Sequence, residues 1–333
     1  MDEKNGAARP LLAVRDLCVS FFTHVGEVKA IRGISFHVDP GETVGIVGES
    51  GSGKSVTSLA VLRLLPYPGR IMSGNVTFRG EDILSKSAGN MRALRGNEIS
   101  MVFQDPMTSL NPVFTIGEQI VEALAVHGGK KSPAEARTRA IEMLNLVGIP
   151  DPEARFGAYP HEFSGGMRQR AMIAMALVCG PSLLIADEPT TALDVTIQAQ
   201  ILELMAGLRE KTGASIILIT HDLAVVSEAC SRIIVMYGGQ IMEEAPSEEL
   251  FENPLHPYTK GLMRCIPAFG GAGRERLVPI PGTPPDLLKP PAGCPFVERC
   301  REAMRICLSN RPAFYGEGRH RASCWRLDPE APK

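Results

Sequence analysis

The chain has 333 residues, 44% of them hydrophobic and 22% charged, so it can bury a core, and a disordered or fibrous protein is excluded. Its 35 Lys and Arg nearly balance 37 Asp and Glu, which leaves no chain-wide basic field to attract nucleic acid or an anionic membrane. Its longest uncharged stretch, Ala171 to Ala186, is interrupted by Gly180-Pro181 and falls short of the roughly 20 apolar residues of a membrane span. The acidic, polar start differs from a signal peptide, so we expect the protein to stay in the cytosol.

Short runs rich in Val and Ile alternate with helical patterns from Leu11 to about Asn253, as in an α/β domain with a largely parallel sheet. The predicted buried strands are Thr43 to Val47, Ile99 to Phe103, Leu183 to Ala186, Ser215 to Thr220 and Arg232 to Met236. Two predicted helices have clear ends. One begins after the N-cap Ser132 and ends at Gly148, and the other follows Asp194 and ends at Gly213.

A glycine-rich segment follows the first predicted strand and precedes a helical run that extends from Val56 to Leu65. It reads Gly48-Glu49-Ser50-Gly51-Ser52-Gly53-Lys54-Ser55 and fits the phosphate-loop pattern GxxxxGK[ST]. Such a loop points backbone N–H groups at phosphates, while Lys54 would meet the β- and γ-phosphates and Ser55 would coordinate Mg²⁺. The alternative, a flexible glycine turn, is disfavoured by the Lys-Ser pair and by the strand, loop and helix around it. We therefore predict a nucleotide site that includes Val56, the next residue of the helix.

Two adjacent carboxylates, Asp187 and Glu188, follow the apolar run Leu183 to Ala186. Successive strand residues point to opposite faces, so the two can take different roles. Asp187 suits the Mg²⁺ shell, and Glu188 suits a general base that polarises an attacking water. An Asp-Glu pair alone is a weak signal, and its weight comes from the phosphate loop upstream.

The segment Phe163-Ser164-Gly165-Gly166-Met167 resembles the signature, commonly LSGGQ, of the ATP-binding cassette (ABC) family. The family's other motifs match in order: Gln104 as the Q-loop glutamine, Thr191-Ala192-Leu193-Asp194 as the D-loop and His221 as the switch histidine. Only the first and last residues of the signature depart from the common form. The resemblance implies an α/β P-loop ATPase core with a helical signature subdomain at about residues 106–175.

The resemblance also implies how these motifs meet ATP. ABC cassettes dimerise head to tail, so Ser164, Gly165 and Gly166 would contact ATP held by the phosphate loop of a second cassette, with Asp194 at the same interface. Gln104 would reach Mg²⁺ and the attacking water, and His221 would sense the γ-phosphate. An aromatic residue upstream of the phosphate loop would stack on the adenine, and Phe22 is the predicted one.

Four cysteines, Cys294, Cys300, Cys307 and Cys324, lie within 31 residues, after a proline-rich run from Pro279 to Pro291. They contain no CxxC pair, which argues against an ordinary zinc ribbon. Four thiolates can hold zinc or an iron–sulfur cluster, and spacing does not decide between them. Arginines beside the cysteines suit an anionic 4Fe–4S cluster: they are Arg299, Arg301, Arg305, Arg319 and Arg321. Free buried thiols are the remaining alternative.

The segment that begins Leu255-His256-Pro257-Tyr258-Thr259-Lys260, together with Pro281 to Leu287 and Gly293-Cys294-Pro295-Phe296, resembles the C-terminal extension of oligopeptide/dipeptide ABC importer ATPases. Importer ATPases of this subfamily that have the same set of cysteines are similar to members that carry a 4Fe–4S cluster, so the resemblance implies such a cluster here. The resemblance implies a nucleotide-binding domain at residues 1–255 and a small, irregular, cysteine-rich extension at 256–333. It also implies a peripheral ATPase on the cytoplasmic face of the cell membrane.

The function implied is ATP-driven import of di- or oligopeptides, with a second homologous ATPase as heterodimer partner, two transmembrane permeases and an extracellular or periplasmic substrate-binding protein. The same motor could import nickel, glutathione or sugars. A different class, an ABC ATPase acting on DNA or the ribosome, usually has two cassettes, a coiled coil or a zinc-bearing insertion. The sequence shows none of these, so no nucleic-acid partner is expected. A metal–sulfur redox enzyme would need a substrate pocket and a redox partner that the sequence does not indicate.

Overall fold

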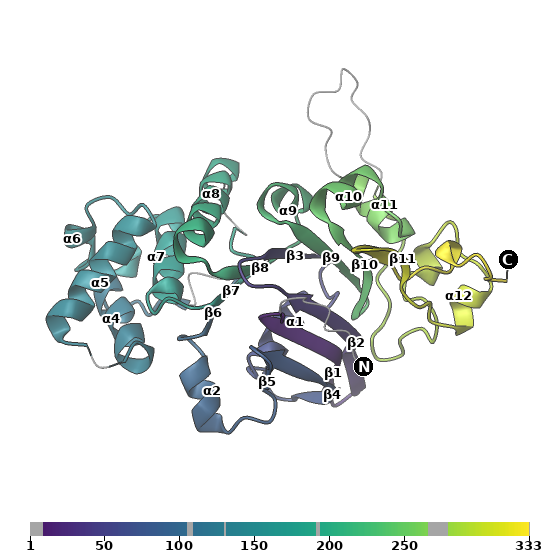
Figure 1. The fold of residues 1–333 in the computed structure, drawn as a ribbon, viewed down its shortest axis with the longest axis horizontal. Helices are drawn as coiled ribbons and strands as arrows, with labels where there is room; N and C mark the ends of the chain where they lie inside the picture. The colour runs from purple at the N-terminus through teal and green to yellow at the C-terminus, as the bar shows by residue number, and fades with distance from the viewer. Residues whose placement is uncertain (1–8, 105–108, 130, 191–193, 266–278, 333) are drawn as a thin grey trace, which may run out of the picture. The chain divides into compact units, whose positions relative to one another are not determined.

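The computed structural model describes residues 9–104, 109–129, 131–190, 194–265 and 279–332. The chain divides into two compact units, whose elements are labelled in Figure 1. Unit 1 consists of Met1–Val38, Thr43–Leu84 and Thr220–Lys333, and unit 2 of Asp39–Glu42 and Ser85–Ile219. Unit 1 thus contains the phosphate loop, and unit 2 contains the signature and the Asp187-Glu188 pair.

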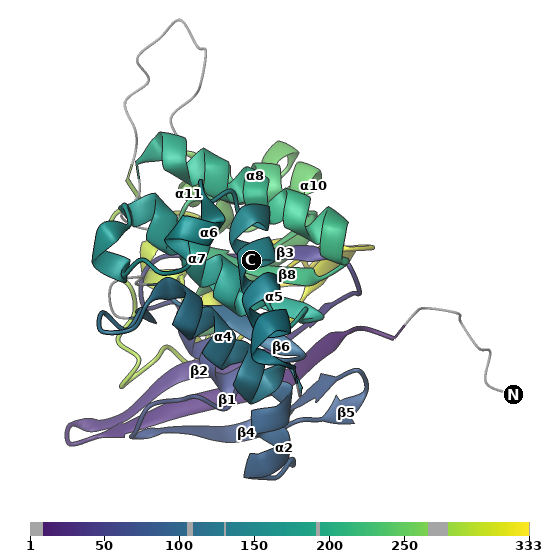
Figure 2. The same ribbon diagram turned by 90° about the vertical axis from the view of Figure 1, so that its left-hand side faces the viewer.

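Unit 1 has an antiparallel sheet in the order β2-β1-β4-β5, and Figure 2 shows the three longer strands side by side. The strands are β1 (Leu12–Thr23), β2 (Gly26–Val38), β4 (Gly69–Phe78) and β5 (Glu81–Asp82). In β1, Leu12, Val14, Leu17 and Val19 are buried. The register between β1 and β2 shifts at three places, which breaks the period-2 pattern that identifies a half-buried strand.

A second sheet of unit 1 has the order β3-β9-β10-β12-β11. Its strands are β3 (Thr43–Val47), β9 (Arg232–Tyr237), β10 (Gln240–Pro246), β12 (His320–Ala322) and β11 (Tyr315–Glu317). β3 runs parallel to β9, and both are fully buried. Gly238 and Gly239 turn β9 into β10 with φ of 55° and 76°, where glycine is favoured.

Unit 1 contains the helices α1 (Lys54–Val61), α9 (Leu223–Ala229), α10 (Ser247–Glu252) and α11 (Pro257–Met263). α9 packs against β3, α10 against β9 and β10, and α11 against β10. Near the C-terminus lie the short helices η2 (Val297–Arg299), α12 (Ile306–Ser309) and η3 (Trp325–Leu327).

One buried carboxylate ties the segments of the C-terminal region to β10. Glu243 is 0% exposed and accepts hydrogen bonds from the N–H groups of Leu255 (2.7 Å) and His256 (2.8 Å), and it contacts His320 Nε2 at 2.8 Å. The proline-rich run is held as well, because the Lys29 N–H of β2 donates to the Leu287 carbonyl at 2.9 Å. A buried charge with several partners fixes the segments that supply them.

Unit 2 has a parallel sheet in the order β6-β7-β8, formed by β6 (Ile99–Val102), β7 (Leu183–Asp187) and β8 (Ser215–Thr220). Its helical elements are α2 (Ala88–Leu94), α4 (Ile116–His127), α5 (Pro133–Leu146), α6 (Pro152–Arg155), η1 (Pro160–Glu162), α7 (Gly165–Leu177) and α8 (Val195–Thr212). α4, α5 and α7 pack on one another, with Ile120, Leu144 and Ile173 fully buried among the core residues.

The five predicted strands are confirmed, with ends that differ by at most one residue. The two helix ends read from capping residues are confirmed too. Ser132 and Glu135 form a reciprocal capping box on α5, and Asp194 Oδ1 accepts the Ile197 N–H of α8 at 2.9 Å. The helix after the phosphate loop differs from the prediction, because it begins at Lys54 and ends at Val61.

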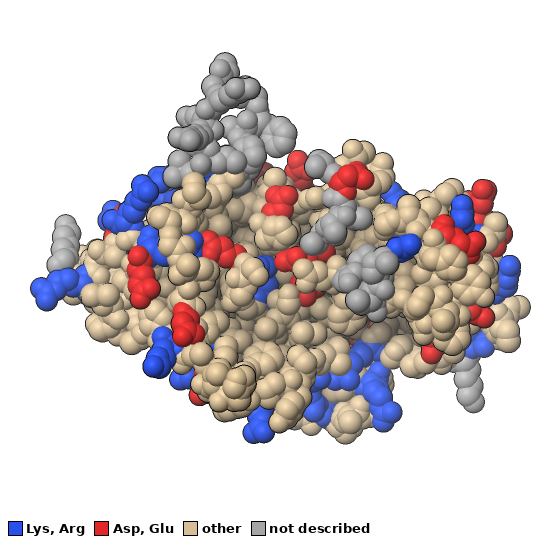
Figure 3. Space-filling view, turned by 180° about the vertical axis from the view of Figure 1, so that it is seen from behind, with Lys and Arg blue, Asp and Glu red and all other residues tan. Residues whose placement is uncertain are grey.

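Charged groups of both signs occur across the face drawn in Figure 3, as the balanced composition leads one to expect. Among the residues described, no helix is both long and apolar enough to span a membrane.

Candidate nucleotide-binding site

The phosphate loop has a backbone that only glycine can adopt at its first position. Gly48 has φ of 150°, and a Cβ atom there would lie 2.1 Å from the Met236 carbonyl oxygen of β9. The Gly239 N–H, in the turn after β9, donates to the Ser52 carbonyl at 3.1 Å. The loop is therefore packed against the β9–β10 hairpin, which limits its freedom before any ligand binds.

Polar groups suited to phosphate are gathered inside the loop. Lys54 is 5% exposed, and its Nζ donates to the carbonyl oxygens of Gly48 (2.7 Å) and Glu49 (3.1 Å). The Ser52 hydroxyl is buried without a hydrogen-bond partner. The loop leads into the N-terminus of α1, whose first N–H groups have no intrahelical acceptor. A buried hydroxyl, an ammonium group and a helix N-terminus around one loop fit a phosphate group.

The back of the loop contacts the C-terminal region of the chain. The Glu49 N–H donates to Tyr258 Oη at 2.9 Å, and the Arg299 guanidinium donates to both Glu49 carboxylate oxygens, at 2.6 and 3.1 Å. These partners lie 209 and 250 residues away in the sequence. Sequence reasoning missed both roles, because the motif identifies the loop but contains no signal for what packs behind it.

Two other predicted residues, Phe22 and His221, lie in the same unit as the loop. Phe22, in β1, is 39% exposed, and the Arg70 guanidinium lies 5.3 Å from its ring centroid. His221 is exposed and directly follows β8.

Unit 2 brings Gln104 and Glu188 together. Gln104 Nε2 donates to Glu188 Oε2 at 2.8 Å. Asp187 ends β7 and is 5% exposed. Glu188 has φ of 47°, in the left-handed region, and its N–H donates to the Ile219 carbonyl at 2.8 Å. A non-glycine residue held there stores strain of about 1 to 3 kcal/mol, which is common at functional sites.

The signature lies at the N-terminus of α7. Ser164 is the N-cap, its Oγ accepting the Met167 N–H at 3.3 Å, and both Ser164 and Gly165 are exposed. Phe163, which stands where the common signature has leucine, is 3% exposed. The difference therefore exchanges one buried apolar side chain for another. A Cβ atom on Gly166 would lie 2.8 Å from Ile197 Cγ2 of α8. Asp194 is exposed, and the preceding D-loop residues Thr191 to Leu193 lie outside the described residues.

The four C-terminal cysteines line one small pocket. Burial raises the pKa of Cys294 to about 12 and that of Cys300 to about 11. Two of the neighbouring arginines have carboxylate partners, since Arg299 pairs with Glu49 and Arg321 with Glu244. In the part of the chain that the structure describes, no three His, Cys, Asp or Glu side chains gather closely enough to hold a single metal ion.

Comparison with protein families gives two matches. Residues 31–191 match the family model for the ABC transporter, and residues 242–307 match the model for the oligopeptide/dipeptide transporter, C-terminal region. The first match contains the phosphate loop, the signature and the Asp187-Glu188 pair. The second contains Tyr258, Arg299 and three of the four cysteines.

Relatives match nearly the full length. The chain is 55% identical to the oligopeptide transport ATP-binding protein OppD of Bacillus subtilis, over 97% of this chain and 90% of the relative. It is 51% identical to the dipeptide transport ATP-binding protein DppD of Escherichia coli, over 96% and 97%. A solved dimeric structure of the ATP-binding cassette MJ0796, bound to ADP and Pi, aligns with a TM-score of 0.64 and 27% identity over 71% of this chain and 98% of that one. The chain therefore belongs to the ABC transporter family, among the ATP-binding proteins of oligopeptide and dipeptide transport.

Proposed function

We propose that this protein is the ATP-hydrolysing motor subunit of a membrane ABC importer for di- or oligopeptides. One observation carries the proposal: a phosphate loop with a buried, unpartnered hydroxyl lies on the same chain as a C-terminal region that matches oligopeptide/dipeptide transporters. The peptide specificity in the names of relatives at 51–55% identity supports the substrate class.

The loop would bind ATP through its own backbone and through Lys54. On binding, Lys54 Nζ exchanges the carbonyls of Gly48 and Glu49 for the β- and γ-phosphate oxygens, and the Ser52 hydroxyl gains a partner. The N–H groups from Gly51 to Val56 surround the phosphates at the start of α1. Ser55, Gln104 and Asp187 would hold Mg²⁺, which neutralises charge on the phosphate oxygens when bound.

Glu188 would accept a proton from the attacking water. The hydrogen bond from Gln104 orients its carboxylate, which is what a general base needs before its substrate arrives. His221 would contact the γ-phosphate, and Phe22 would stack on the adenine. In the dimer, Ser164, Gly165 and Gly166 of one chain would close on the ATP of the other, with Asp194 beside them. The exposed N-terminus of α7 supports this arrangement.

The assembly we propose places this subunit at the cytoplasmic face of the cell membrane, beside two permeases and a second homologous ATPase. A substrate-binding protein outside the membrane would select the cargo. Residues 1–255 would form the nucleotide-binding domain, with its helical subdomain at about 106–175, and 256–333 the cysteine-rich extension. ATP-driven closure of the two ATPases would then change the permease conformation.

We further infer that Cys294, Cys300, Cys307 and Cys324 hold a structural 4Fe–4S cluster. Support comes from the pocket that the four share and from Cys294 and Cys300, because burial raises the pKa of both and makes their thiolates costly unless a cationic centre compensates.

Reconstitution tests the transport function. The complete complex in vesicles should take up a labelled dipeptide or oligopeptide when ATP is on the cytoplasmic side, and Lys54→Ala in this subunit, tested with the partner ATPase inactivated, should abolish both uptake and hydrolysis. Uptake of nickel, glutathione or a sugar without peptide uptake would show that the proposed substrate class is wrong. Copurification with nucleic acid, in the absence of permease, would instead indicate an ABC ATPase that acts on DNA or the ribosome.

Metal analysis after anaerobic purification tests the cluster. Iron and sulfide should be found in about equal amounts, roughly four of each per chain, and Cys307→Ser should lose both. A matched control is Cys179→Ser, because Cys179 lies in unit 2, outside the cysteine pocket. One equivalent of zinc without sulfide would establish a zinc site, and the absence of both metals would leave free thiols.

A further inference from the structure

Arg299 uses every donor of its guanidinium group. Nε donates to the Pro281 carbonyl (2.9 Å), and Nη1 donates to Glu49 Oε2 (2.6 Å) and Tyr237 Oη (3.0 Å). Nη2 donates to Glu49 Oε1 (3.1 Å) and the Ile280 carbonyl (3.1 Å). The side chain is only 6% exposed. Since a guanidinium has five N–H donors in a fixed plane, these partners define one position for it.

The acceptor at the centre of this network is part of the phosphate loop. Glu49 directly follows Gly48, and its carboxylate receives two parallel bonds from Arg299, the strongest geometry for such a pair. Its backbone is held as well, because its N–H donates to Tyr258 Oη. The C-terminal region thus fixes both the side chain and the main chain of this loop residue.

The groups behind Glu49 are packed against one another. The rings of Tyr237, Tyr258 and Phe296 pack with centroid separations of 4.6, 5.2 and 5.3 Å. Tyr258 is 0% exposed, and burial raises its pKa above the usual range, so its hydroxyl stays protonated. A hydrogen-bonded network backed by buried, packed rings favours one geometry.

Fixing Glu49 affects the groups that meet phosphate. Lys54 Nζ donates hydrogen bonds to the carbonyls of Gly48 and Glu49. The orientation of the Glu49 carbonyl therefore helps to determine the position of the ammonium group before ATP binds. A loop already held in its binding conformation avoids the ordering cost on ligand binding, and this raises affinity.

We propose that Arg299 and Tyr258 are positioning residues of the nucleotide site, which fix Glu49 so that the phosphate loop is preorganised for ATP. The C-terminal region is then a working part of the ATP site. This inference rests on the proposed nucleotide site and goes beyond it, because it assigns a role in ATP affinity to residues that touch neither phosphate nor base.

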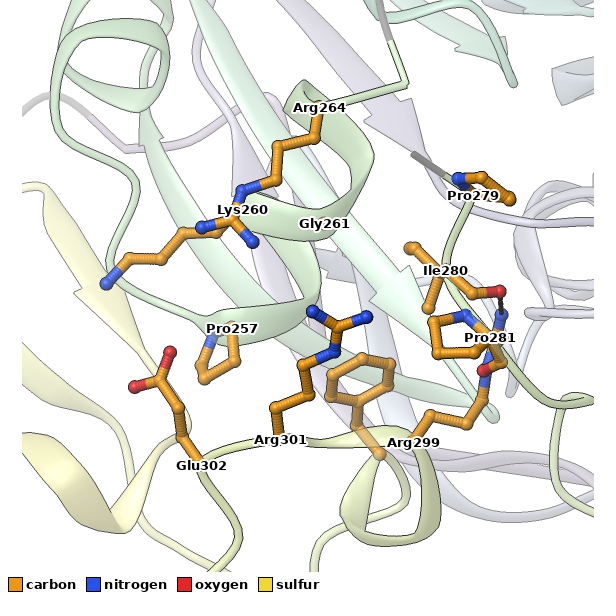
Figure 4. A pocket seen from close by; sticks show the side chains of 11 residues that line it. Pro257, Lys260, Gly261, Arg264, Pro279, Ile280, Pro281, Arg299, Arg301 and Glu302 are labelled. Atoms are coloured by element: carbon orange, nitrogen blue, oxygen red, sulfur yellow. Dashed lines mark hydrogen bonds between the residues drawn. The ribbon is translucent and has the colours of Figure 1, made fainter. Parts of the chain in front are cut away.

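A neighbouring arginine provides a matched control. Arg301 borders the same pocket as Arg299. Figure 4 shows Arg299 reaching the Ile280 carbonyl, whereas Arg301 points toward Lys260 and Arg264. Arg301 has the same charge and segment but makes none of the contacts to Glu49.

The test is a double-mutant cycle on the full-length chain, with the Kd for Mg²⁺-ATP as readout. Arg299→Met and Glu49→Gln should each raise Kd by about tenfold. The Kd of the double variant should be no higher than that of the weaker-binding single variant, because both substitutions remove the same contact. Arg299→Lys, which retains charge but cannot bond to both oxygens, should recover only part of the affinity. Arg301→Met should bind like the wild type.

Hydrolysis in the assembled transporter adds a second readout. Arg299→Met should raise the KM for ATP while leaving kcat within about twofold, since the residue does not touch the reacting atoms. An unchanged Kd in Arg299→Met, or fully additive losses in the cycle, overturns the proposal. If Arg299→Met does not fold, Glu49→Gln tests the same contact from the loop, and an unchanged Kd there overturns it equally. A folded wild-type chain that binds no ATP would reject the nucleotide site itself.

Discussion

The phosphate loop and the signature end of α7 are both glycine-rich, yet they are supported in opposite ways. The loop residues are packed against β9 and held from behind by Tyr258 and Arg299. In the signature, Ser164 and Gly165 are exposed. The capping bond there is local, because Ser164 Oγ accepts it from the Met167 N–H of the same helix. One region is complete within the chain, while the other presents a helix N-terminus to solvent.

The contrast indicates which region can act alone. On our proposal, the phosphate loop binds ATP in the single chain, because its geometry is already set. The signature acts only when a second ATPase supplies the phosphate. Substitutions in the two regions should therefore cause losses in different assays.

The largest expected effect is at the signature. Gly165→Asp places a carboxylate against the γ-phosphate of the partner site, and like charges in a poorly hydrated gap cost several kcal/mol, on the order of a thousandfold in association. ATP-dependent dimerisation, measured by light scattering with Glu188→Gln as background, should be lost, while single-chain ATP affinity is kept. The control is Gly207→Asp, since a Cβ atom there meets nothing within 4 Å. Closure that survives Gly165→Asp would refute the head-to-tail assignment.

Removing the proposed base should have the next largest effect. Glu188→Gln should retain ATP binding and lower turnover by about a hundredfold or more, because an amide cannot accept the proton. The measurement needs a complex whose partner ATPase is inactivated. Glu210→Gln, on the exposed face of α8, is the control. Wild-type turnover in Glu188→Gln would remove this residue from the role.

A pH effect probes the region behind the phosphate loop. Burial lowers the pKa of His256 to about 3, while an unfolded chain restores a value of roughly 6.5. The unfolded state therefore binds the extra proton in this window, and stability falls by about 1.4 kcal/mol per unit as the pH drops from 6.5 toward 3. His256→Asn should remove this contribution and keep an acceptor for the Tyr258 N–H.

Urea unfolding followed by the fluorescence of Trp325, the only tryptophan, measures that slope. Trp325 lies in η3 of unit 1, so it reports on the correct unit. His161→Gln serves as the control, because His161 is exposed. If the pH slopes of wild type and His256→Asn coincide, His256 is not buried in its neutral form.

The smallest expected effect is far from both regions in the sequence. Ser132→Ala removes the acceptor of the Glu135 N–H at the start of α5 and should lower the unfolding free energy by about 1 kcal/mol. Ser132→Asp should retain most of it. ATP affinity should not change in either variant, and a change would mean that this helix end affects the nucleotide site.

Local signals explain what the sequence predicted correctly. Ser132 and Asp194 mark helix starts because capping requires a short polar side chain at one position. Gly48 marks the phosphate loop because no other residue fits beneath the Met236 carbonyl. β1 and β2 were not among the predicted strands, since their register shifts interrupt the alternation that prediction depends on.

Long-range contacts explain the rest. The pairing of Arg299 with Glu49 is set by how β9, α11 and η2 pack in three dimensions, and neither residue is unusual in its own segment. In the sequence, Arg299 lies beside Cys300, where an anionic cluster would give it a different role. The sequence shows the charge of Arg299, but its partner follows from tertiary structure alone.

The separation of 250 residues between Glu49 and Arg299 also has a consequence for biosynthesis. A ribosome adding about 5 to 20 residues per second needs on the order of 10 to 50 s to go from one to the other. For that time the phosphate loop of the growing chain lacks its ion-pair partner, although its own sequence is complete. On our proposal, the nascent protein would reach its full affinity for ATP only near the end of its synthesis.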